Sequence, residues 1–67
     1  MSKEDLIDME EGALKYFYYE KEIILNELEK AIEENNTDEM IKSRDRLVMI
    51  RELIEAKEER LKKLRGN

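Results

Sequence analysis

The chain has 67 residues, of which 46% are charged, with 18 Asp and Glu against 13 Lys and Arg and a net charge of −5. A compact monomer of this size buries only about 60% of its unfolded surface, which leaves little room for a deep catalytic cleft. The chain contains no Cys and no His, and this excludes thiolate and imidazole metal sites and Cys-His or Ser-His nucleophile pairs. We therefore expect a protein that is not an enzyme and that uses no metal and no cofactor.

Hydropathy and charge also bear on location. No apolar run is longer than the one from Tyr16 to Tyr19, which is far shorter than the roughly 20 residues that a membrane-spanning helix needs. The N-terminus Met-Ser-Lys-Glu-Asp is too acidic for a signal peptide. The sequence has no glycine-rich phosphate loop. These features predict a cytoplasmic protein with no membrane and no small-molecule partner.

The first predicted element is a long helix over about residues 3–34. Ser2 followed by Asp5 resembles a capping box, and Glu4 and Asp5 place negative charge in the first turn, where the helix dipole favours it. Nothing interrupts this helix before Glu34. At about 100° per residue, one face is apolar and holds Leu6, Ala13, Leu14, Phe17, Ile24, Leu28, Ala31 and Ile32.

The same helix carries a second apolar stripe. Tyr16-Phe17-Tyr18-Tyr19 covers about 300° of the helix circumference, so one packing face cannot bury all four side chains. A 3-4-3-4 spacing runs along the side away from Phe17 through Met9, Gly12, Tyr16, Tyr19 and Ile23. We expect this stripe to be a partner or oligomer interface, either the core of a dimeric four-helix bundle or a docking face for a different protein. Gly12 at its middle favours close approach of a neighbouring helix.

The apolar pattern stops at Asn35-Asn36, which predicts a tight turn, and Asn36 with Glu39 three residues later is typical of an N-cap. The second helix is predicted over about residues 37–65, ending at Gly66. Its apolar face holds Met40, Leu47, Ile50, Ile54, Leu61 and Leu64. Four of these residues recur every seven positions, a spacing typical of a coiled-coil seam.

Together these elements predict an all-α fold, a single domain over residues 1–67 that forms an antiparallel, coiled-coil-like two-helix hairpin and dimerises into a four-helix bundle. Residues 1–34 carry a charge of −7 and residues 35–67 a charge of +2, so the two halves attract each other. Facing residues have numbers that add up to about 71, which sets Phe17 by Ile54 and Ile24 by Leu47. The same register predicts the pairs Glu20–Arg51 and Glu27–Arg44. The predicted hairpin core is Phe17, Ile24, Leu28, Met40, Leu47, Ile54 and Leu61.

In length and layout the chain resembles plasmid copy-number regulators of the Rop type, helical hairpins that dimerise into four-helix bundles and bind paired RNA loops. That family reads RNA with a basic and aromatic face on its first helix, whereas this first helix is the acidic one. No functional residue is therefore carried over. Small hairpin co-chaperones of secretion systems share the layout equally well. An RNA-binding alternative would use the second helix, with contacts from Lys42, Arg44, Arg46 and Arg51.

The function that we expect is a protein–protein interaction module. It would be a small regulator or adaptor that self-associates as a homodimer or binds a partner helix through the tyrosine stripe, with nucleic acid as the less favoured partner. Usage rich in Lys, Glu, Ile and Asn and poor in Ala indicates a bacterial or phage origin.

Overall fold

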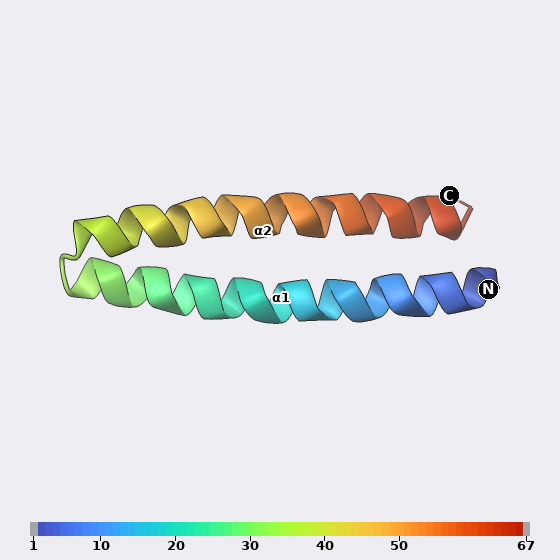
Figure 1. Ribbon diagram of the computed structural model, residues 1–67, viewed down its shortest axis with the longest axis horizontal. Helices are drawn as coiled ribbons and strands as arrows, with labels where there is room; N and C mark the ends of the chain where they lie inside the picture. Colours follow the sequence, from blue (N-terminus) through green and yellow to red (C-terminus); the bar gives the residue numbers. More distant parts are fainter. Residues whose placement is uncertain (1, 67) are drawn as a thin grey trace.

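The computed structural model describes residues 2–66 and consists of two α-helices joined by a short turn (Figure 1). Helix α1 spans Lys3–Glu33 and helix α2 spans Thr37–Leu64. The two helices run antiparallel and lie side by side along their whole length, so that the start of α1 lies beside the end of α2 (Figure 1). The prediction of an all-helical fold with two helices packed against each other is confirmed.

Local hydrogen bonds explain where the helices begin and end. The Asp5 amide donates to the Ser2 side chain at 3.1 Å, and the Glu39 amide donates to the Asn36 side chain at 3.3 Å. Asn35 adopts a left-handed backbone with φ of 54°, which Asn tolerates better than most residues. The amides of Asn35 and Asn36 then donate to the carbonyls of Ile32 and Ala31. This is a Schellman motif, which satisfies the last carbonyls of α1 and reverses the chain.

The core is a seam of side chains between the helices. Of the predicted core residues, Ile24, Leu47, Ile54 and Leu61 are buried, while Phe17, Leu28 and Met40 are half-buried. Ile50 and Ala31 are also buried. Ile32 differs from the expectation, since it is 54% exposed: it lies one residue, or about 100° of helix, beyond Ala31 and so points off the seam.

Two polar positions interrupt the apolar seam. Ser43 is buried near the turn, at about the same height as Ala31, and two small side chains there suit close approach of the helices. At the other end the Glu10 side chain, only 12% exposed, places Oε2 at 2.7 Å from Lys57 Nζ and Oε1 at 3.4 Å from Arg60 Nε. Glu10 Oε2 accepts no well-aligned hydrogen bond, so its contact with Lys57 is mainly electrostatic.

The predicted charge pairs Glu20–Arg51 and Glu27–Arg44 are wrong. Glu27 instead pairs with Arg46 at 2.6 Å, and across residues 2–66 no ion pair joins Glu20 to Arg51 or involves Arg44. Flanking residues of antiparallel helices meet only on the same side of the seam. Glu20 and Glu27 flank one side, whereas Arg44 and Arg51 flank the other, where Arg65 pairs with Glu11 at 2.8 Å.

The hairpin is a single layer of helices and therefore exposes an unusually large surface. Its accessible surface is 5226 Å², whereas a compact monomer of 8.1 kDa exposes about 4,500 Å². Its radius of gyration is 15.2 Å, against about 11 Å for a compact chain of this length. A second layer, which most domains use to cover their apolar faces, is missing over residues 2–66. The two broad faces of the hairpin are thus the places to look for function.

Candidate interaction surfaces

The first face, which we call the tyrosine face, combines Met9, Tyr16, Tyr19 and Ile23 of α1 with Met49 and Leu53 of α2. It lies on the side of the seam marked by the Glu27–Arg46 pair, because Arg46, Met49 and Leu53 follow helical 3-4 spacing along α2. Ile23 is half-buried, and the other five side chains are between 46% and 65% exposed. The predicted stripe is thus continued by a second helix.

The contribution of α2 to this face was missed by reasoning from the sequence. The signal was present, because Arg46, Met49, Leu53 and Ala56 keep the same 3-4 spacing as the α1 stripe. This spacing is hard to see in the sequence because charged residues stand close to Met49 and Leu53. With α2 included, the tyrosine face is a shallow apolar strip across both helices instead of a line along one.

Gly12 of the predicted stripe and Tyr16 of the tyrosine face have local environments that bear on the chemistry of this surface. Gly12 is exposed, and a Cβ atom built on it would meet nothing within 4 Å, so no helix of this chain requires a glycine there. Tyr16 lies beside Phe17, with ring centroids 6.2 Å apart. A hydrogen bond to Glu20 and the negative charge of Glu20 raise the pKa of Tyr16 above its ordinary value of 10.0, so this phenol stays neutral to a higher pH than an unperturbed tyrosine.

The second face, which we call the mixed face, lies on the opposite side of the seam. Its exposed apolar side chains, between 41% and 54% exposed, are Tyr18, Ile32, Ile41 and Val48. Two contacts across the helices mark this side: Tyr18 donates a hydrogen bond to Glu58 at 2.8 Å, and Glu11 pairs with Arg65. The Glu58 carboxylate raises the pKa of Tyr18, chiefly through this hydrogen bond.

Residues spaced seven apart on each helix extend this side of the seam from the contact of Tyr18 with Glu58 toward the turn. Stepping from Tyr18 along α1 reaches Leu25 and then Ile32, and stepping from Glu58 along α2 reaches Arg51 and then Arg44. Both arginines therefore lie across from aliphatic side chains, and within residues 2–66 neither forms an ion pair. The sequence predicted no protein interface here and gave Arg44 and Arg51 only as contacts of the RNA-binding alternative, although the seven-residue spacing of Leu25 with Ile32 and of Ile41 with Val48 was a usable signal.

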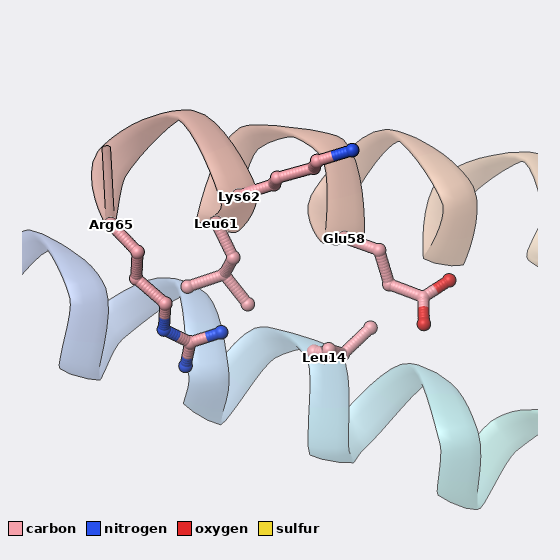
Figure 2. Close-up of a pocket in the computed structure, with 5 residues that line it drawn as sticks. All are labelled: Leu14, Glu58, Leu61, Lys62 and Arg65. Atoms are coloured by element: carbon pink, nitrogen blue, oxygen red, sulfur yellow. The ribbon is translucent and has the colours of Figure 1, made fainter. Parts of the chain in front are cut away.

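A shallow groove opens on the mixed face at the end of the hairpin away from the turn. Figure 2 shows Leu14 of α1 and Leu61 of α2 directed toward each other, with Arg65 reaching across to α1 and Glu58 standing at the rim. Lys62 borders the same groove from α2. The groove thus has an apolar floor and charges of both signs along its edges.

The four basic residues of the RNA-binding alternative do not form one patch. Lys42 and Arg46 lie toward the tyrosine face and are engaged with acidic residues, Lys42 with Glu39 at 3.8 Å and Arg46 with Glu27. Arg44 and Arg51 belong to the mixed face. This division gives the RNA-binding alternative no contiguous basic surface.

Over residues 2–66, no three acidic side chains come together in a way that could hold a metal ion. Neither α1 nor α2 contains a stretch apolar enough to cross a bilayer. Comparison with known proteins returns no relative: no family model matches the chain, and no curated protein or solved structure matches it either.

Proposed function

We propose that the protein is a non-enzymatic interaction module, a small regulator or adaptor that works by placing its tyrosine face against a helix of another chain. The observation that supports this is the extent of the face: five large apolar side chains, drawn from both helices, stand about half exposed on one side of a single-layer hairpin. Contiguous apolar surface of this kind is rarely left in water by a soluble monomer.

The composition of the tyrosine face suits protein association. Tyrosine and methionine are enriched in interfaces, since tyrosine combines a large apolar ring with a hydroxyl that hydrogen-bonds at the rim. The shallow valley between two antiparallel helices matches the ridge of a third helix. The partner element that fits best is therefore an amphipathic helix that contributes an apolar stripe.

The experiment compares the wild-type chain with the double variant Tyr16→Glu, Tyr19→Glu. Each protein is immobilised and exposed to native lysate of the source organism, and retained proteins are quantified by mass spectrometry. Asn26→Glu is the matched control, because Asn26 lies one heptad after Tyr19 on the same exposed side of α1 and gains the same carboxylate.

We expect at least one protein to be retained by the wild type and by Asn26→Glu, and to be lost from the tyrosine variant, whose helicity stays unchanged. Sedimentation equilibrium of all three proteins tests whether a second copy covers this face instead. Equal retention by all three proteins, with equal self-association, contradicts the proposal.

A further inference from the structure

We propose that the mixed face binds a second copy of this chain, in a dimer whose two-fold axis runs parallel to the helices. Each α1 then lies over the α2 of the other copy, and both turns are at the same end of a four-helix bundle. The proposal deepens the proposed function, because it assigns self-association to one face and leaves the tyrosine face for a different protein.

The first step is the register of the hairpin. Residues at the same height on α1 and α2 have numbers that add up to about 73, as the pair Glu27–Arg46 shows directly. Glu10 and Arg60 add up to 70, and the two contacts on the mixed face, Tyr18 with Glu58 and Glu11 with Arg65, both add up to 76, so the value of 73 lies between them. A two-fold axis parallel to the helices preserves height, so the same rule states which residues of the two copies would meet.

In the half of the mixed face that lies near the turn, this rule predicts that apolar residues of one copy contact apolar residues of the other. Leu25 of one copy meets Val48 of the other, and Ile32 meets Ile41. The exposed parts of these four aliphatic side chains are thereby covered without any change in the hairpin. Their burial supplies the apolar centre that a stable interface needs.

The rule also gives the two unpaired arginines their partners. Glu22 of one copy meets Arg51 of the other, and Glu29 meets Arg44. Within one chain Arg44 and Arg51 lie across from Ile32 and Leu25, and none of the four charged residues forms an ion pair within residues 2–66. All four are exposed, so their side chains are free to make these contacts.

The match continues to the open end of the hairpin, around the groove of Figure 2. Glu58, Lys62 and Arg65 line that groove, and Lys15 lines a neighbouring hollow that shares Leu14, Leu61 and Arg65 with it. All four charged residues therefore lie on the mixed face. The layers that the rule brings together are Lys15 with Glu58, Glu11 with Lys62, and Asp8 with Arg65. Each is a pair of opposite charge, even though the sign on α1 changes at Lys15.

The tyrosine face does not complement itself in the same way. At matched heights Glu20 meets Leu53, Ala13 meets Arg60, and Lys30 lies by Lys42, so only Glu27 and Arg46 remain complementary. On the mixed face every charged layer except that of Glu55, which meets Tyr18, is matched by opposite charge, whereas most on the tyrosine face are not. Specificity in association depends on such complementarity, which is why the second copy is assigned to the mixed face.

The size of the surface is adequate for a dimer. The matched rows run from Asp8 to Ile32, about 36 Å of helix, and the hairpin is 15 Å wide and 49 Å long. The chain exposes roughly 700 Å² more than a compact monomer of its mass, an excess close to the approximately 800 Å² per partner of a standard interface.

The experiment uses charge reversal. One variant carries Arg44→Glu and Arg51→Glu, and another carries Glu22→Arg and Glu29→Arg. In each, the rows that meet across the two-fold axis have like charge, so we expect the dimer dissociation constant to rise at least about tenfold in sedimentation equilibrium. The control Asp45→Arg, Glu52→Arg changes the neighbouring residues on the solvent side of α2 and leaves the dimer intact.

An equimolar mixture of the two reversed variants is the decisive sample. Acidic and basic rows are again opposite each other in the mixed dimer, so we expect a heterodimer with affinity close to that of the wild type, identified by native mass spectrometry from its intermediate mass. Far-ultraviolet circular dichroism checks that each variant keeps its helices.

The proposal is overturned by a wild type that stays monomeric up to near-millimolar concentration, by reversed variants that dimerise as well as the wild type, or by a mixture that does not recover. A further chain that carries all four substitutions separates pairing between chains from pairing within one chain. If dimerisation is recovered only in this chain and not in the mixture, the charged residues pair within one chain, which also overturns the proposal. Loss of the dimer in Tyr16→Glu, Tyr19→Glu alone would assign the second copy to the tyrosine face. Failed partner capture with an intact wild-type dimer contradicts only the proposed function.

Discussion

At the scale of single residues, the contact of Glu10 with Lys57 is the point where charge enters the seam. Lys57 belongs to the seven-residue series of Ser43, Ile50 and Leu64 along the seam, and its ammonium is 2.7 Å from a nearly buried carboxylate. A half-buried ion pair of this kind adds little net stability, but removal of one partner leaves the other charge without compensation.

We therefore predict that Glu10→Ala lowers the free energy of unfolding by about 1–3 kcal/mol. The double variant Glu10→Leu, Lys57→Leu should recover this loss or exceed it, because it fills the seam with apolar volume. Urea denaturation at matched protein concentration measures both. A double variant less stable than Glu10→Ala would show that the pair stabilises the fold directly.

Gly12 gives a second prediction. The space around it is open and it lies inside a helix, so Gly12→Ala should raise the free energy of unfolding by about 0.5–1 kcal/mol. Gly66→Ala is the control, since Gly66 has φ of 81°, where a Cβ is disfavoured. Thermal melts compare the two. Loss of partner binding in Gly12→Ala, together with higher stability, would indicate that a partner helix packs closely at this position.

Tyr18 links stability to alkaline pH. Because its pKa in the folded chain is raised above 10.0 by Glu58, folding favours the neutral phenol. This contribution is fully present below pH 10 and is lost as the pH rises through the folded pKa. We expect Glu58→Ala to lower the pH at which tyrosinate absorbance appears, and Tyr18→Phe to remove this difference. Identical titrations of wild type and Glu58→Ala would contradict the assignment.

At the scale of elements, the helices were predictable because their limits are set by local chemistry. Ser2 and Asn36 cap the helices through amides three residues later, and such caps are visible in the sequence. The cross-helix charge pairs were not, because the sequence alone does not say on which side of the seam a flanking residue lies. The predicted sum of about 71 pointed to Arg44 as the partner of Glu27, whereas the packed helices bring Arg46 to it, at a sum of 73.

The same limit applies to the candidate surface. Met9, Tyr16 and Tyr19 were identified from the spacing of one helix, whereas Met49 and Leu53 join them only once α2 is placed alongside. The mixed face escaped notice because its apolar residues alternate with charged ones on both helices. A pattern shared between two elements becomes visible only when their register is known.

The turn offers a prediction at this scale. Asn35 has a positive φ, which a β-branched residue adopts at a cost of about 1–2 kcal/mol. We expect Asn35→Val to destabilise the hairpin by about that amount and Asn35→Gly to leave stability unchanged or slightly higher. Chemical denaturation measures both. Equal stability of the two variants would mean that the turn tolerates a different backbone path.

At the scale of the whole molecule, the elongated shape makes the proposed dimer easy to recognise by small-angle scattering. Two hairpins stacked face to face at a layer spacing of about 10 Å should double the molecular mass and increase the radius of gyration from 15.2 Å by only about 1 Å. Hairpins joined end to end would give a far larger increase. A doubled mass with a radius of gyration well above this value would contradict stacking.

The Schellman turn between Ala31 and Asn36 also has a consequence for the order of events during folding. Contacts near the turn close the shortest loops and lose the least chain entropy, so the transition state should contain the turn and the layer of Ala31 and Ser43. Substitutions there should slow folding, whereas substitutions at Glu10 or Lys57, at the far end, should mainly accelerate unfolding. The contacts between the helices would then form first at the turn and last at the open end, and during unfolding the open end would separate first.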